Sequence, residues 1–164
     1  MDGKMTINHE ANTVGLAGII QFPVTMKGIG TPETCPICKK TKSEEETKSY
    51  DKFFNNEEKT EFEAIARDYP ALKEMLPPKN VRYRIVDKKS RASARTKFKN
   101  ARQRAKTELG MDVHEGEIHH PHPLVYGGCP VHQKMIKKTT EDNKRVDERI
   151  NTVFDKVNAR YEVN

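Results

Sequence analysis

The chain has little of what a large hydrophobic core needs. Its 164 residues include no tryptophan, and only 34% of them are hydrophobic whereas 33% are charged. The mean hydropathy is −0.88. This length suits one domain, but we expect a thin core that is supplemented by a metal, a partner or extensive helix surface.

Long apolar runs are also missing. The most apolar stretch, VGLAGIIQFPV at residues 14–24, is about half the length that a bilayer-crossing helix requires. Its proline and glycines suit an extended segment better than a helix. The first residues also lack the charged start and cleavage site of a signal peptide at the right distance. We therefore expect no membrane partner and no export signal within this chain.

Positive charge is concentrated in one block. The net charge is +6, but residues 81–106 hold eleven Lys and Arg against the single acid Asp87, whereas residues 44–68 are acidic on balance. Such a block can track a phosphate backbone, because each neutralised phosphate releases a condensed counterion. The alternative is a solvated helix face. The position of the block, just before a histidine cluster, favours nucleic-acid binding by Arg82, Arg84, Lys88, Lys89, Arg91, Arg95, Lys97, Lys99, Arg102, Arg104 and Lys106.

Periodicity and turn residues predict a mainly helical α+β chain. We divide it into an N-terminal extended segment (1–56), a helical basic region (57–110) and a C-terminal region (111–164) that together form one compact domain. The expected elements are an irregular stretch at 1–34, a helix at 57–69, a short strand at 81–86, a helix at 90–109 closed by Gly110, strands near 116–120 and 131–138, and a last helix capped by Thr139 or Thr140.

The segment GEIHHPHPLVYGGCPVHQ at 116–133 holds four of the six histidines. It resembles the active-site hairpin of HNH endonucleases, the ββα-metal or His-Me finger group, and most closely the form found in nuclease colicins and polymorphic-toxin tips. The matching positions are Glu117, Ile118, His119, His120, Pro123, Leu124, Gly127 and Gly128. The resemblance implies a ββα-metal core of hairpin plus helix, extending to about residue 150. An incidental proline-rich surface loop is the alternative for these histidines, and His114, which matches nothing, is expected to face solvent.

The resemblance assigns roles to the two adjacent histidines. His119 would be a metal ligand and His120 the general base that deprotonates the attacking water. Neighbouring strand residues point to opposite sides, so both rings can serve one site only where the strand bends. Pro121 and Pro123 would supply that bend.

The family takes its remaining ligands from one face of the following helix, at positions i and i+4. Asn143 and Asp147 match these positions, and a slip of one residue would give Lys144 and Glu148 instead. We prefer the first pair, because amide and carboxylate oxygens suit Mg²⁺ or Mn²⁺ and a lysine is a poor ligand. Zn²⁺ and Ni²⁺ are alternatives.

The sequence also departs from the family. The family's middle asparagine, which helps to hold the loop and the base, should fall near Lys134 or Met135, and neither residue is an asparagine. The helix histidines of the colicin form are absent as well.

The three cysteines suggest a second metal site. CPIC at 35–38 and CPVH at 129–132 share one pattern of ligand, proline, aliphatic residue and ligand. This repetition suits a structural tetrahedral zinc site made by Cys35, Cys38, Cys129 and His132. The alternative is a redox CxxC with one free thiol.

These observations lead us to expect a metal-dependent DNA endonuclease of low sequence specificity, with RNA as the alternative substrate. A zinc-stabilised nucleic-acid-binding module without catalysis and a nucleic-acid deaminase are the other hypotheses, although the H-x-E and P-C-x-x-C patterns of deaminases fit poorly. By resemblance the protein would be an antibacterial toxin, secreted or delivered to act in the cytoplasm of a target cell, with an acidic immunity protein as partner. A cytoplasmic phage or restriction-type enzyme is the alternative setting.

Overall fold

The computed structural model describes residues 19–20, 35, 38, 46–108, 110 and 116–163. Of the predicted irregular stretch at 1–34, only Ile19 and Ile20 are described, and they form strand β1; His114 and Leu109 lie outside the described residues. The helices are α3 (Tyr50–Phe53), α4 (Asn56–Asp68), the 3₁₀ helix η1 (Pro70–Met75), α5 (Lys88–Thr107), the 3₁₀ helix η2 (Leu124–Tyr126) and α6 (Glu141–Arg160). The other strands are β2 (Lys48–Ser49), β3 (Arg82–Tyr83), β4 (Ile118–His119) and β5 (Met135–Lys137).

Helix α4 confirms the helix predicted at 57–69. The side chain of Asn55 accepts a hydrogen bond from the backbone of Glu58, and the Glu58 carboxylate accepts one from the backbone of Asn55. This capping box fixes where the helix begins. The helix ends before Pro70, where the chain tightens into η1.

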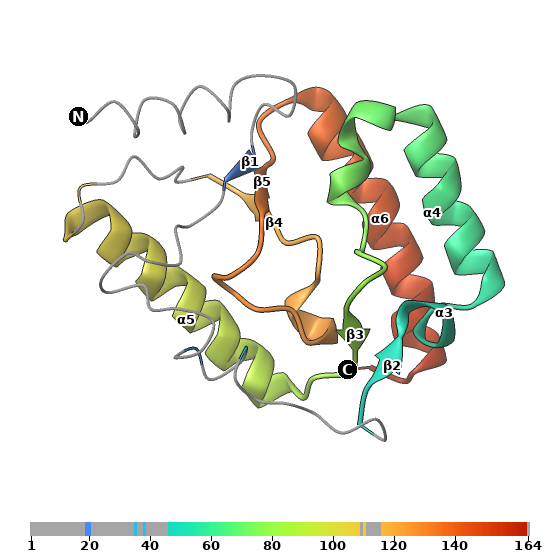
Figure 1. Cartoon of the computed structure of the whole chain (residues 1–164), viewed down its shortest axis with the longest axis horizontal. Coiled ribbons are helices and arrows are strands. Elements are labelled where there is room, and N and C mark those ends of the chain that lie inside the picture. Colours follow the sequence, from blue (N-terminus) through green and yellow to red (C-terminus); the bar gives the residue numbers. More distant parts are fainter. Residues whose placement is uncertain are drawn as a thin grey trace.

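Helix α6 packs against α4 and η1 (Figure 1). Thr140 caps it by accepting a hydrogen bond from the backbone of Asn143, in agreement with the prediction of a threonine cap. Its apolar face is buried as the spacing predicted, and consists of Val146, Ile150, Val153, Phe154 and Val157.

A cluster of rings fills the space beside α6. We call it the aromatic core; its members are Tyr50, Phe53, Phe54, Phe62, Tyr83, Tyr126 and Phe154. Phe53 lies at its centre, with ring centroids 5.3 Å from Tyr83 and 5.0 Å from Tyr126. These rings come from all three predicted segments of the chain, so the segments share one hydrophobic core.

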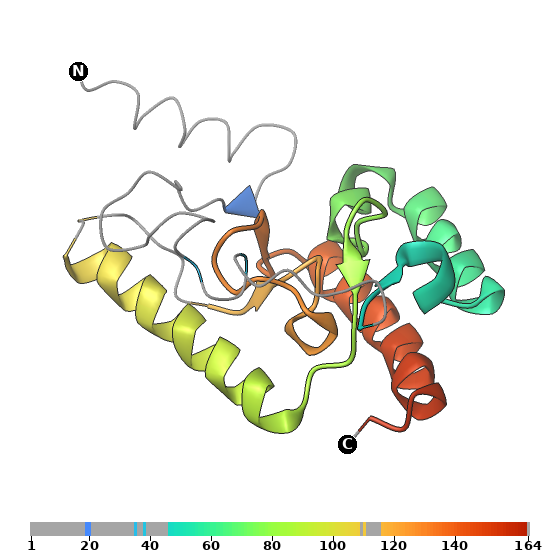
Figure 2. The ribbon, with the colours of Figure 1, turned by 60° about the horizontal axis from the view of Figure 1, so that its bottom comes forward.

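The hairpin region, residues 116–138, contains β4, η2 and β5. Strand β5 pairs antiparallel with both β4 and β1 in a three-stranded sheet, with His119 opposite Ile136. Figures 1 and 2 show this region between α5 on one side and α6 on the other. The strands confirm the two predicted near 116–120 and 131–138, although each is shorter.

Helix α5 begins two residues before the predicted Ser90, because Asp87 caps it by accepting a hydrogen bond from the backbone of Ser90. Its narrow buried stripe is made by small side chains: Ala94, Ala101 and Ala105. Ala105 packs with Met135 of β5 and with Phe98 and Ile118 in a second, smaller apolar cluster.

Helices and small antiparallel sheets therefore form one α+β fold, as predicted. Strand β3 confirms the short strand predicted at 81–86, and its partner β2 and helix α3 were not foreseen. Among the described helices, none has the length and apolarity needed to cross a membrane.

Candidate functional site

The two predicted knuckles meet although they are far apart in sequence. The Sγ atoms of Cys35 and Cys129 are 3.6 Å apart, and His132 Nδ1 lies 3.4 Å from Cys38 Sγ and 3.6 Å from Cys129 Sγ. All four ligand atoms lie within 4.8 Å of one another. Zn–S bonds of about 2.3 Å and Zn–N bonds of about 2.0 Å would place tetrahedral ligand atoms roughly 3.5–3.8 Å apart. The cluster therefore has the dimensions to hold a metal ion such as zinc.

The surroundings of the cluster support the same conclusion. Burial, together with the neighbouring thiols, raises the pKa of Cys38, and burial raises the pKa of Cys129 despite hydrogen bonds from backbone N–H groups. The backbone N–H of His132 donates to Cys129 Sγ at 3.3 Å. Packing three thiols together disfavours their thiolate forms, and a central cation would remove that penalty.

Gln133 connects the knuckle to the histidine loop. Its Oε1 accepts from the backbone N–H of His122 at 3.0 Å, and its Nε2 donates to the carbonyls of His122 at 3.0 Å and Cys129 at 2.7 Å. This amide braces the loop, a role that the sequence led us to expect at position 134 or 135. The sequence signal for this contact was the amide side chain of Gln133, one position before Lys134.

The glycine pair lets this loop close. Gly127 has a φ of +98°, which favours glycine. A Cβ on Gly128 would lie 1.8 Å from the His122 carbonyl oxygen, so no side chain fits there. The pair thus brings the knuckle against the backbone that follows His120.

His119 is buried and faces helix α6. Its Nε2 lies 2.6 Å from the Met75 carbonyl oxygen and its Nδ1 lies 2.9 Å from Asp147 Oδ1. A carbonyl only accepts, so Nε2 carries a proton and donates to Met75. Nδ1 then faces a carboxylate oxygen. Either a second ring proton or a cation bound by both atoms would satisfy this pair.

The structure brings Asp147, and not Glu148, to this histidine. Asp147 Oδ2 also accepts from Lys138 Nζ at 3.1 Å and from Asn151 Nδ2 at 3.1 Å. Burial alone would raise the pKa of Asp147, but the hydrogen bonds from His119 and Lys138 outweigh it and lower that pKa. Glu148 and Lys144, the residues of the alternative register, are exposed.

Asn143 lies one turn earlier on α6 and is 1% exposed. Its side-chain oxygen is hydrogen-bonded with the Thr140 hydroxyl, and its Nδ2 lies 3.5 Å from Met75 Sδ. It therefore shares Met75 as a neighbour with His119 without being hydrogen-bonded to that histidine.

His120 points to the other side of the strand. Its ring packs edge-on against Phe98 of α5, with centroids 4.7 Å apart, and its Nε2 lies 3.2 Å from the Pro130 carbonyl oxygen. Burial lowers the pKa of His120 to about 4. The ring is therefore neutral near pH 7; with Nε2 donating to Pro130, Nδ1 keeps a lone pair that can accept a proton. The pair does not converge on one set of contacts: His119 faces α6 and His120 faces α5.

The ring of His122 is held by contacts within the protein. Its Nε2 lies 3.3 Å from the Tyr126 carbonyl oxygen, and its ring packs against Tyr83 at a centroid distance of 4.8 Å. Burial lowers the pKa of His122 to about 4.

The predicted nucleic-acid-binding residues include cations that contact other parts of the protein and cations that are exposed on α5. Arg82 donates to the Thr47 hydroxyl and carbonyl, which joins β3 to the segment before β2. Arg102 donates to the Gly116 carbonyl and lies over the Phe98 ring. The exposed cations of α5 are Lys88, Lys89, Arg95, Lys99, Arg104 and Lys106.

No protein-family model, curated protein or solved structure matches this chain. The candidate site consists of a Cys/His cluster, a His119–Asp147 pair and a basic helix around one hairpin.

Proposed function

We propose that this protein is a metal-dependent endonuclease that hydrolyses phosphodiester bonds with low sequence specificity, with DNA as its substrate and RNA as the alternative. The observation that carries the proposal is the 2.9 Å approach of His119 Nδ1 to Asp147 Oδ1. It joins the strand that bears the His-His pair to the helix that follows the hairpin. This order of strand, loop, strand and helix is the one that the HNH resemblance implies.

The donor set fits a divalent cation. An imidazole nitrogen and a carboxylate oxygen about 3 Å apart match neighbouring positions of an octahedral shell with bonds of about 2.1 Å. The Nε2–H of His119 is held by the Met75 carbonyl at 2.6 Å, and such outer hydrogen bonds orient metal-binding imidazoles. Mg²⁺ or Mn²⁺ suits the carboxylate, whereas Zn²⁺ or Ni²⁺ suits the imidazole. Such an ion would offset the charge that grows on the phosphate.

Asn143 is the weakest of the proposed ligands. Its oxygen is hydrogen-bonded with Thr140, so it would have to exchange this partner for the ion. His119 and Asp147 are therefore the ligands on which the proposal depends.

His120 is the proposed general base. Its ring is neutral near pH 7 because burial lowers its pKa to about 4. Its Nδ1 would take a proton from water while the Pro130 carbonyl holds Nε2. Since Pro130 lies between two proposed zinc ligands, the knuckle would fix the orientation of the base.

Helix α5 is the proposed phosphate-binding surface. Its exposed cations include Arg95 and Lys99, while Phe98 on the same helix contacts His120. A strand bound along α5 would therefore run beside the base. Contacts of this kind bind the backbone without reading the bases.

The Cys/His cluster is proposed to be a structural zinc site. Cys35, Cys38, Cys129 and His132 could supply four ligands, which would complete a tetrahedral shell and leave no position for water. A closed shell suits a structural ion and does not favour a deaminase.

A second candidate function is a zinc-stabilised nucleic-acid-binding module without catalysis. The 3.1 Å ion pair between Lys138 and Asp147 favours it, because the carboxylate already has a cationic partner. In that case the His119–Asp147 pair would only tie β4 to α6.

The resemblance suggests delivery as an antibacterial effector, with an acidic immunity protein that covers α5 and neutralises its cations. A purified candidate inhibitor should then compete with DNA for this helix.

The test of the main proposal is a metal titration of plasmid nicking with two neighbouring variants. Asp147→Ala should raise the Mg²⁺ or Mn²⁺ concentration needed for half-maximal nicking at least tenfold, because it removes a ligand. Glu148→Ala, one position along the helix and exposed, is the matched control and should change it less than about twofold. Equal effects of the two substitutions, or no metal-dependent nicking by the unmodified protein, would favour the binding module.

A further inference from the structure

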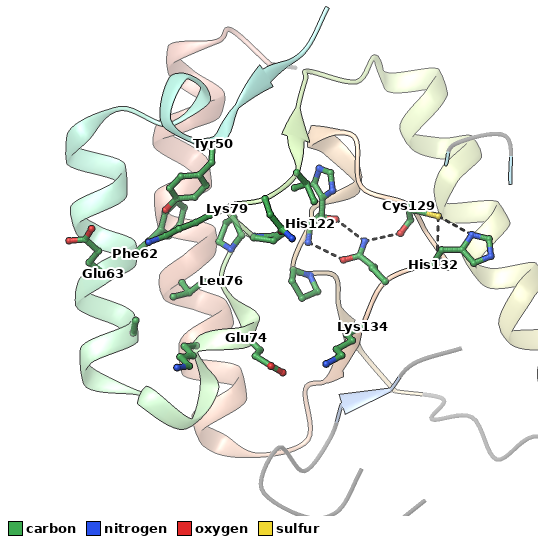
Figure 3. A pocket seen from close by; sticks show the side chains of 18 residues that line it. Tyr50, Phe62, Glu63, Glu74, Leu76, Lys79, His122, Cys129, His132 and Lys134 are labelled. Atoms are coloured by element: carbon green, nitrogen blue, oxygen red, sulfur yellow. Dashed lines mark hydrogen bonds between the residues drawn. The ribbon is translucent and has the colours of Figure 1, made fainter. Parts of the chain in front are cut away.

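A cavity of about 710 Å³ opens between η1 and the hairpin region (Figure 3). One wall comes from the α4–η1 side and includes Phe62, Ala66 and Leu76. The opposite wall comes from the hairpin and includes Pro121 and Gln133. This size is typical of cavities that enclose a small organic ligand.

The lining of the cavity is mostly apolar in area, but charged side chains also reach it. Lys73, Lys79 and Lys134 line it, with Glu63 and Glu74 as the acids. In Figure 3 Glu74 and Lys134 lie at one end and Lys79 lies near Tyr50 at the other. A ligand that fits this cavity has an apolar face for these walls and an anionic group for the lysines.

Glu74 adds a hydrogen-bond acceptor that a ligand would have to match. Its Oε2 is buried and has no hydrogen-bond partner among the residues that the structure describes. A buried carboxylate oxygen without a donor is costly, so turning the Glu74 carboxylate toward a ligand N–H group in the cavity would gain a charge-assisted hydrogen bond.

The cavity is lined by residues close in sequence to the proposed catalytic histidines. Glu74 precedes Met75, whose carbonyl accepts the hydrogen bond from His119 Nε2 at 2.6 Å. On the other wall, His122 follows His120 by two residues. The segments that hold the two histidines therefore also form walls of the cavity.

We propose that this cavity binds one unstacked nucleotide of the substrate strand, with the base between the apolar walls, a base N–H group on Glu74 and the phosphate near the lysines. This inference rests on the proposed nuclease function and deepens it. A base can enter only after leaving the stack, so the protein should prefer single-stranded or frayed nucleic acid.

The test is binding of 5′-deoxynucleoside monophosphates to the full chain without divalent metal, measured by calorimetry and by amide shifts in NMR spectra. Two smaller probes, 2-deoxyribose 5-phosphate and inorganic phosphate, lack the base and should bind at least tenfold more weakly. Ala66→Phe fills the cavity and should weaken mononucleotide binding at least tenfold. Ala64→Phe is the matched control, because position 64 is about 200° away around α4 and does not line the cavity.

Glu74→Leu provides a second variant that leaves α4 unchanged. It should weaken mononucleotide binding roughly tenfold, because a hydrogen bond to a charged acceptor is lost. Binding that is equal for the mononucleotide and for phosphate, or unaffected by both Ala66→Phe and Glu74→Leu, would overturn the proposal. Nicking assays separate this failure from failure of the nuclease function: a protein that nicks DNA without binding mononucleotides refutes only the cavity, and one that binds them without nicking refutes only the nuclease.

Discussion

The aromatic core and the hairpin region are held together by different chemistry. Around Phe53 the aromatic rings pack against one another, and the Tyr126 hydroxyl donates a hydrogen bond to Asn158 Oδ1 of α6 at 2.7 Å. In the hairpin region, buried apolar side chains such as Val131, Met135 and Ile136 are joined by polar contacts from the Gln133 amide, the histidine rings and the Cys/His cluster. The aromatic core would hold its shape through buried apolar area, whereas the hairpin region also depends on its polar contacts.

A thin core is therefore supplemented in the hairpin region. The aromatic rings of this chain gather beside α6, whereas the hairpin region adds polar groups with fixed geometry to its buried apolar side chains. Such groups position histidines well, but each depends on a specific partner.

The largest expected effect is removal of a metal ligand. Cys35→Ser should abolish binding of about one zinc per chain and lower the free energy of unfolding by on the order of 5 kcal/mol, because metal binding and folding are coupled. Elemental analysis and thermal unfolding measure both quantities. Ser93→Ala on the exposed side of α5 is the control. A protein that holds no zinc and melts at the same temperature with and without a chelator would refute the zinc site.

The next largest effect tests whether the aromatic core and the hairpin region are stabilised independently. Phe53→Ala removes a ring that is 1% exposed and should lower the free energy of unfolding by about 4 kcal/mol, through lost contacts and a cavity. Zinc content should stay unchanged, because no ligand is touched. Denaturant titration and metal analysis of the same sample test this, and loss of zinc would show that the two regions are not separable.

A smaller effect is expected at Gln133. Gln133→Leu removes three hydrogen bonds to the loop backbone and should cost about 2–3 kcal/mol, with slower nicking. Gln133→Glu keeps the acceptor for the His122 N–H but loses both donated bonds, so its loss of stability should be intermediate. Equal stability of all three proteins in urea would show that the amide does not brace the loop.

The smallest effect is a pH dependence. The folded pKa of His122 is about 4, below its ordinary value of 6.5, so the unfolded chain binds more protons between these values. The stability that the neutral ring contributes is present above pH 6.5 and is lost as pH falls through 4. His122→Gln should therefore flatten the decline of stability between pH 6.5 and 4. Identical slopes for the two proteins would contradict this account.

The sequence predicted the elements with strong local signals. Helix α6 has a regular apolar face and a threonine cap, and α4 has its capping residue and a proline that ends it. The Cys/His cluster was also predictable, because two knuckles of one pattern specify a shared site whatever the distance between them.

The remaining features depend on tertiary contacts. Helix α3 and strand β2 are short and have no periodicity, and the ring packing around Phe53 decides their structure. The partners of the histidines could not be foreseen either, since a carbonyl such as that of Met75 or Pro130 carries no sequence signal. The prediction of two histidines at one strand end did not reveal that they face different helices.

The most direct test of the nuclease proposal is plasmid nicking by His120→Ala at saturating Mg²⁺ or Mn²⁺. Loss of the proposed base should slow nicking at least ~100-fold, while DNA affinity and zinc content change little. Nicking at the unmodified rate by a homogeneous His120→Ala preparation would contradict the account.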